Sequence, residues 1–272
     1  MDRRNDQGLQ RGAEERGEDE VKDTITIDGE LFYTDYEIPD DDAVIWRFLD
    51  LAKFISLLKE KALYMSRADK FEDQFEGAVC SLEDSVKYDE ALMDYYSECL
   101  EGKPVSEQLI YNEHYAIQMI RKNSFLNCWF EGSFESIAMW KLYASGKDAK
   151  GVAIKTTVGR LKKAIGRIVE IGRISYIDYS KEWPNANEAL WRKRLSFEYE
   201  HEVRVRVITE GGLSPTPPEF MLLPVDLDVL IESVFVSPMA ETWFKDLVVD
   251  VLQKYGLNKE VFHSALDDKA LY

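Results

Sequence analysis

The stretch FEYEHEVRVRV, from Phe197 to Val207, decides how the rest of the sequence is interpreted. Its residues alternate as in a β-strand, in which successive side chains point to opposite faces of the sheet. One face is then an ordinary packing face that carries Tyr199, His201, Val203, Val205 and Val207. The other face carries the five ionisable residues Glu198, Glu200, Glu202, Arg204 and Arg206. Such a row is either a solvated sheet face or the wall of a polar site, and the pattern is compatible with both.

Composition limits the classes of function. The chain has 272 residues, 45% of them hydrophobic, so it can bury a sizeable core. A net charge of −17 disfavours broad nucleic-acid binding, because an acidic surface repels phosphate backbones. The sequence has no Gly-rich phosphate loop and no nucleophile elbow, which argues against P-loop NTPases, Rossmann dehydrogenases and α/β-hydrolases.

Cysteine usage and hydropathy indicate the compartment. Cys80, Cys99 and Cys128 show no paired metal-ligand spacing, so we expect no metal site. No apolar run approaches the roughly 18 residues of a membrane span, and the charged N-terminus lacks the apolar segment of a signal peptide. We therefore expect a cytoplasmic protein without membrane partners.

The chain divides into a tail and one domain. Residues 1–23 are almost entirely polar and charged and cannot bury enough apolar surface to offset chain entropy, which predicts a disordered tail. Residues 24–272 mix strand and helix patterns without an internal repeat. This mixture predicts a single α+β domain with a mixed or antiparallel twisted sheet and inserted helices.

The first long element pair is the most regular. A buried strand is expected at 43–50, followed by a helix that Asp50 caps and whose apolar stripe starts at Leu51. Further strands are expected at 62–66, 124–130, 151–156, 167–179, 221–227 and 233–237. Further helices are expected at 84–100, 106–122, 136–145, 158–165, from Pro184 onward and at 241–255.

Four sequence boxes occur in a recognisable order. They are YMSRADKFEDQFEG (64–77), CWFEGSFESIAMWKLYASGKDAKGVAI (128–154), KRLSFEYEHEVR (193–204) and SVFVSPMAETWFKDLVVDVLQKYGLNKEVFHSAL (233–266). In order and spacing they resemble the bacterial family called domain of unknown function 2971, over nearly all of 44–266. The layout is more distantly similar to ADP-ribosyltransferase-like domains, which carry a glutamate on a late strand.

These resemblances imply a nucleotide-handling enzyme that transfers a glycosyl group from a dinucleotide such as NAD, with a role in phage defence. By this analogy Glu200 or Glu202 would hydrogen-bond the ribose and stabilise positive charge on the sugar carbon as nicotinamide leaves. The candidate catalytic residues are Glu202, Glu200, Tyr143 and Arg47. We expect Glu202→Gln to abolish ligand-dependent activity while leaving the fold intact.

Tyr143 and Arg47 each have two interpretations. Tyr143 and Trp140 share a helix face and could stack a base or a nicotinamide ring, although we favour a core role for Trp140. Arg47 lies in an apolar strand, where it either clamps a phosphate or carboxylate or points to a wet face.

The candidate ligand-binding residues are Arg204, Trp140, Asp73, Glu76 and Lys193. Asp73 and Glu76 could orient Arg47 or Arg204, but we favour a structural latch in which nearby phenylalanines plug the core. Lys193 either forms an ion pair with one of these acids or is solvated. Cys128 is expected to be a small buried hydrophobe.

Two rival functions remain open. One is a non-catalytic module whose acidic surface binds a protein partner, and the other is a nuclease that uses the acids to hold a metal. The sequence specifies neither the substrate nor a cofactor nor the oligomeric state.

Overall fold

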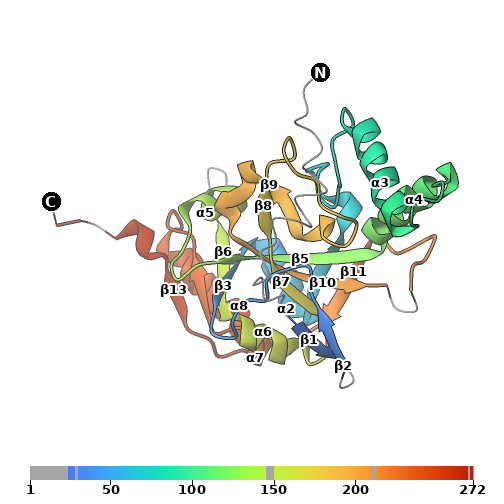
Figure 1. Cartoon of the computed structure of the whole chain (residues 1–272). Coiled ribbons are helices and arrows are strands. Elements are labelled where there is room, and N and C mark those ends of the chain that lie inside the picture. Colours follow the sequence, from blue (N-terminus) through green and yellow to red (C-terminus); the bar gives the residue numbers. More distant parts are fainter. Residues whose placement is uncertain (1–23, 28–29, 145–149, 210–211, 269, 272) are drawn as a thin grey trace.

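The computed structural model describes residues 24–27, 30–144, 150–209, 212–268 and 270–271. It is an α+β domain built on a nine-stranded, largely antiparallel sheet (Figure 1). The predicted fold class is therefore confirmed. The predicted tail, 1–23, and the last residue of the helix expected at 136–145 lie outside the described residues.

The strands follow the predicted order closely. They are β1 (Thr24–Ile27), β2 (Glu30–Tyr33), β3 (Val44–Asp50), β4 (Ala62–Arg67), β5 (Ser124–Glu131), β6 (Gly151–Thr157), β7 (Glu170–Arg173), β8 (Ser175–Ile177), β9 (Arg192–Arg194), β10 (Glu202–Ile208), β11 (Phe220–Pro224), β12 (Ser233–Val236) and β13 (Val261–His263).

The helices are α2 (Leu51–Glu60), α3 (Ser85–Cys99), α4 (Glu107–Asn123), α5 (Ile137–Tyr143), α6 (Val158–Ile165), α7 (Leu227–Leu230) and α8 (Thr242–Lys254). Short 3₁₀ turns are η1 (Ala68–Lys70), η2 (Ala189–Trp191), η3 (Leu195–Glu200) and η4 (Ala265–Asp267). As predicted, the Asp50 side chain caps α2 by accepting from the Lys53 amide at 2.8 Å.

The main sheet forks at β5. The order is β11-β4-β5-β3-β6-β12-β13, and β10 pairs with the whole length of β5 and with β7. On its other edge β5 pairs first with β4, at Leu126, and then with β3, at Phe130. The backbone of β5 between these two pairings therefore needs other hydrogen-bond partners.

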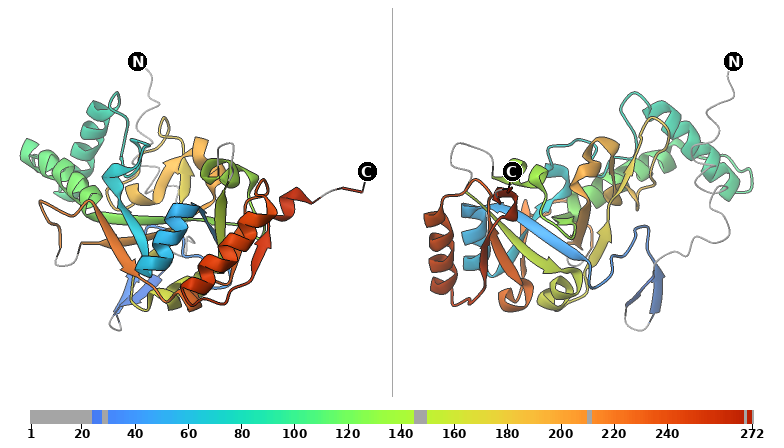
Figure 2. Two further views of the ribbon diagram at one scale, coloured as in Figure 1. Left: turned by 180° about the vertical axis from the view of Figure 1, so that it is seen from behind. Right: turned by 90° about the vertical axis from the view of Figure 1, so that its left-hand side faces the viewer.

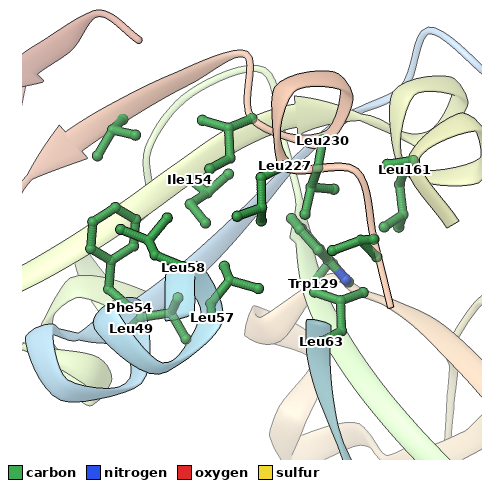
Figure 3. Packing of buried hydrophobic residues seen from close by; sticks show 14 of the residues in the cluster. Leu49, Phe54, Leu57, Leu58, Leu63, Trp129, Ile154, Leu161, Leu227 and Leu230 are labelled. Carbon is green, nitrogen blue, oxygen red and sulfur yellow. The ribbon is translucent and has the colours of Figure 1, made fainter. Parts of the chain in front are cut away.

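Two apolar layers cover the sheet. The larger core packs α2, α6, α7 and α8 against one face, and Figure 3 shows Phe54 and Leu58 of α2 beside Ile154 of β6. Seen from behind, α2 and α8 lie on the near side of the sheet (Figure 2, left). A smaller aromatic cluster on the opposite face joins Trp46 and Phe48 to Trp140 of α5. The α3–α4 pair lies at one end of the molecule (Figure 1).

Two predicted elements that precede Phe197 are wrong. The helix expected from Pro184 is only the turn η2, followed by β9, because the Asn185 side chain accepts from the Asn187 and Glu188 amides and closes a local turn. The strand expected over 167–179 is broken at Ile174, whose amide bonds the Glu202 carbonyl while β8 pairs with β9.

The stretch Phe197–Val207 is not one strand either. Its second half is β10, but its first half forms η3, so Glu198 and Glu200 are not on the strand. The break is at His201, which adopts the left-handed conformation with φ 38° and ψ 55°. This left-handed conformation is uncommon for a residue other than glycine, and it interrupts the extended backbone that a single strand would need.

Candidate functional site

Five charged side chains meet inside the protein at the start of β10. Arg204 is 0% exposed, and its guanidinium donates to Glu202 at 2.6 Å, to Glu76 at 2.9 Å and to the Leu190 carbonyl at 2.6 Å. Glu76 itself is buried and comes from the loop after η1. The charged face of the strand is thus enclosed, not solvated.

Lys193 of β9 is the second cation of the cluster. Its ammonium lies 2.5 Å from Glu200, 3.1 Å from Glu76 and 3.2 Å from Glu202. The predicted ion pair between Lys193 and a box acid is therefore present. We call these five residues, Glu76, Lys193, Glu200, Glu202 and Arg204, the ionic cluster.

The two glutamates of the cluster that flank His201 differ in acidity. Burial raises the pKa of Glu202, but Arg204 and Lys193 outweigh burial and hold that pKa at about 2. Burial also raises the pKa of Glu200, and here the pair with Lys193 does not compensate, since Glu202 and Glu76 add repulsion. One carboxylate is therefore firmly ionised, and its neighbour takes up a proton more readily than an ordinary glutamate.

A small cavity adjoins the ionic cluster on the face that α5 covers. It holds about 20 Å³, room for roughly one water molecule. Its lining includes Arg47, Tyr143, Glu200 and Glu202, together with Trp46, Phe48, Cys128, Trp129, Phe130 and Met139. The structure thus brings the four candidate catalytic residues together from β3, α5, η3 and β10.

Arg47 occupies the fork of the sheet. The Arg47 guanidinium donates to the Cys128 carbonyl, and Asn127 donates to the Tyr64 carbonyl at 2.9 Å. Arg47 thus gives a β5 carbonyl a partner between the two pairings, and Asn127 gives one to a carbonyl of β4. Arg47 is half-buried, and its remaining donors have no partner among the residues that the structure describes.

Tyr143 and Trp140 play different parts on α5. Trp140 is buried, contacts Phe48 edge to face at 4.9 Å and donates to Glu135 at 2.8 Å, which agrees with its favoured core role. Tyr143 is 40% exposed at the cavity, so a ligand can reach it. Burial of its hydroxyl still raises the pKa of Tyr143, which therefore stays a hydrogen-bond donor at neutral pH.

Asp73 and Glu76 have different roles because they bind different arginines. Asp73 pairs with Arg194 at 2.7 and 3.2 Å and accepts from the Phe75 amide at 3.2 Å, as a latch would. Glu76 instead holds Arg204, which was the alternative weighed for this loop.

Two contacts of Glu202 were not predicted from the sequence, although Cys128 itself was expected to be a small buried hydrophobe. The hydroxyl of Tyr176 accepts from the Glu202 amide at 2.8 Å, and the Cys128 thiol hydrogen-bonds the Glu202 carboxylate. Tyr176 pairs in register with Lys193, so recognition of β8–β9 pairing is the signal that would have found it. Cys128 is adjacent to the predicted packing residues of β5, and nothing in its spacing indicates the contact.

Two larger hollows border η3. One of about 340 Å³ is lined by Glu131, Arg173, Ile174, Tyr176, Glu198, His201 and Glu202. The other, of about 410 Å³, is lined by Glu72, Asp73, Gln74, Phe75, Arg194 and Phe197. Each of these hollows and the small cavity takes at least one lining residue from 197–202.

The arrangement does not resemble a metal centre. Within the described ranges no group of three or more His, Cys, Asp or Glu side chains has a geometry that could hold a metal ion. The three glutamates of the ionic cluster converge on the ammonium of Lys193, which supplies the positive charge there.

Comparisons with known proteins leave the family open. No protein-family model matches the chain, and no curated protein matches it. Among the helices that the structure describes, none combines the length and the apolar character needed to cross a membrane.

Proposed function

We propose that the protein is a cytoplasmic enzyme that transfers a glycosyl group from a nucleotide such as NAD, with Glu202 and Glu200 as its catalytic carboxylates. The single observation that carries the proposal is the contrast between these two residues. Glu202 is held ionised, Glu200 has a raised pKa, and both line a cavity that Arg47 and Tyr143 also line. Carboxylates whose pKa values are pushed apart at one site are typical of paired acid–base roles.

The chemistry assigns one part to each carboxylate. As the bond between the sugar carbon and the nicotinamide nitrogen breaks, its electron pair leaves with the nitrogen. Positive charge then develops on the sugar carbon, where the ionised Glu202 stabilises it. An acceptor hydroxyl oxygen forms the new bond to that carbon, and its proton passes to Glu200, whose raised pKa suits a general base.

Arg47 and Tyr143 would position the ligand. Arg47 keeps free guanidinium donors beside the cavity, and such donors bind phosphate oxygens strongly. Tyr143 offers a neutral hydroxyl and an accessible ring, which suit a sugar hydroxyl or a nicotinamide ring.

The size of the cavity sets how a ligand would bind. A volume of about 20 Å³ admits only the reacting atoms, so the body of a dinucleotide would lie outside it. The hollows of about 340 and 410 Å³ on either side of η3 are in the range of small-molecule sites. Tyr143, which lines the small cavity, is 40% exposed.

The test compares three variants of the full chain in an assay for NAD consumption and for nicotinamide release. Glu200→Gln removes the general base and is expected to lower turnover by about 100-fold or more. Glu90→Gln, a change of an exposed glutamate on α3 that lines none of the three hollows, is the matched control and should retain parental turnover. Glu202→Gln should also abolish turnover, but Glu202 is buried between Arg204 and Lys193, so we now expect this change to cost stability as well.

Two results would overturn the proposal. Equal turnover in Glu200→Gln and the parent would contradict the role of Glu200 as general base. If no nucleotide shifts the melting temperature of the parent and no NAD is consumed, the protein-binding module becomes the better interpretation. Activity that depends on an added divalent metal would instead favour the nuclease.

A further inference from the structure

The hollow of about 410 Å³ beside η3 has an unusual lining for a surface depression. The Arg194 guanidinium lies over the Phe75 ring, with 4.8 Å to the centroid, and over the Phe197 ring, with 5.4 Å. Both rings are only partly buried. The hollow therefore presents flat aromatic and guanidinium surfaces to whatever occupies it.

This platform is held rigidly. Asp73 fixes Arg194 with two hydrogen bonds, at 2.7 and 3.2 Å. Phe75 also packs edge to face on Tyr179, with ring centroids 4.9 Å apart. A planar ligand that stacks here would meet surfaces that need little reordering, and such preorganisation favours binding.

The rim carries unused hydrogen-bond acceptors. Within the described residues the side chains of Glu72 and Gln74 have no partner, and both are exposed at the hollow. A carboxylate and an amide oxygen accept hydrogen bonds from amino groups. With Glu72 and Asp73 against Arg194, the hollow is net acidic and disfavours phosphate.

We propose that this hollow binds a nucleobase that carries an exocyclic amino group, such as adenine. The ring would stack on the Phe75–Arg194–Phe197 platform and the amino group would donate to Glu72 or Gln74. Stacking of bases on aromatic and guanidinium planes is a general mode of recognition. The inference rests on the proposed function in taking the ligand to be a nucleotide.

The hollow is connected to the candidate catalytic residues through one side chain. The Lys193 ammonium lies 5.0 Å from the centroid of the Phe197 ring and 2.5 Å from Glu200. Only the Lys193 side chain thus separates a base stacked on Phe197 from the general base Glu200. This short path allows one dinucleotide to hold its adenine in the hollow while its nicotinamide ribose, on the other side of the diphosphate, reaches Glu200.

The test measures binding of adenosine, which has no phosphate, to the full chain by calorimetry. Phe197→Ala should weaken adenosine binding by between about fivefold and about 150-fold, the range that corresponds to loss of one base–aromatic stack. Phe220→Ala, which removes an exposed ring on β11 that does not line this hollow, is the control and should bind as the parent does. Inosine replaces the amino group by a carbonyl and should bind more weakly than adenosine.

A second variant distinguishes loss of the stacking ring from misfolding of the protein. Phe197→Trp keeps a flat ring, so adenosine should still bind and should change the tryptophan fluorescence. Absence of adenosine binding by the parent, or equal binding by Phe197→Ala and the parent, would overturn the inference. Glu200→Gln should bind adenosine normally, so failure of the proposed chemistry is distinguishable from failure of the base site.

Discussion

Glu76 and Arg204 lie 128 positions apart in the chain, yet their side chains form a 2.9 Å ion pair in which neither residue is more than 1% exposed. A charge enclosed in this way is stable only while its partner remains. The pair therefore ties the loop after η1 to the central strand β10.

Loss of Glu76 should be strongly destabilising. Glu76→Gln leaves Arg204 and Lys193 with one carboxylate fewer, and breaking a buried pair costs about 3–5 kcal/mol of unfolding free energy. Urea denaturation followed by circular dichroism measures this cost. Glu72→Gln, an exposed change on the same loop, should stay within about 0.5 kcal/mol of the parent. Equal midpoints for the two variants would contradict the role of the pair.

Acid should weaken the protein through Glu202. Its pKa falls from the ordinary value of 4.5 to about 2, so the ionised form stabilises the folded state above pH 4.5. That contribution, about 3 kcal/mol, is lost as the pH falls from 4.5 toward 2. Glu200 acts in the opposite sense, because its raised pKa favours the folded state when it is protonated.

The contribution of Glu202 to the unfolding free energy is measured as the difference between the parent and Glu202→Gln. Unfolding free energies of the parent and of Glu202→Gln are measured at a series of acidic pH values, so that other titrating groups cancel. The difference between the unfolding free energies of the two proteins should become smaller as the pH falls below 4.5. A difference that stays constant would show that Glu202 does not carry the depressed pKa.

His201 should tolerate glycine better than a branched residue. Its φ of 38° lies in the left-handed region, which costs an ordinary residue about 1–2 kcal/mol and glycine almost nothing. We expect His201→Gly to be as stable as the parent or more stable, and His201→Val to be less stable by about 1–2 kcal/mol. Thermal melts of the parent, His201→Gly and His201→Val measure these differences in stability. If glycine destabilises as much as valine, the edge contact of the imidazole with Phe130 is the important feature.

Cysteine labelling should report the enclosure of the site. Burial raises the pKa of Cys128 well above that of a free thiol, so little thiolate is available for alkylation. Cys99 is exposed and should react with iodoacetamide in the native protein. Mass spectrometry should find Cys128 modified only after denaturation. Rapid native labelling of Cys128 would mean that the cavity opens readily.

Much of the fold was predictable because the elements have regular patterns. The strand at Val44–Asp50 and the helix after it follow from an apolar run, a capping aspartate and a 3.6-residue stripe. The helix expected from Pro184 failed because three consecutive buried residues, Ala189 to Trp191, have no helical periodicity. The boundary between the turn and the strand within Phe197–Val207 could not be predicted from the sequence. It is set by the left-handed backbone conformation of His201, which the alternating pattern does not reveal.

The candidate site was predictable in its members but not in its contacts. Arg47, Tyr143, Glu200 and Glu202 were each proposed from the sequence as catalytic candidates, and all four line one cavity. Alternation alone does not distinguish a solvated charged face from an enclosed one, so the burial of Arg204 needed coordinates. The same holds for Glu76, whose choice of Arg204 over Arg47 depends on how the fork of the sheet is filled.

The fork also has a consequence for synthesis on the ribosome. β5 pairs along one edge only with β10, which leaves the exit tunnel much later than β3 and β4. Until that late segment emerges, one side of the middle strand has open amides, and Glu76 has no guanidinium partner. A nascent chain stalled before Glu202 should therefore depend on a chaperone, whereas the released full-length polypeptide should not.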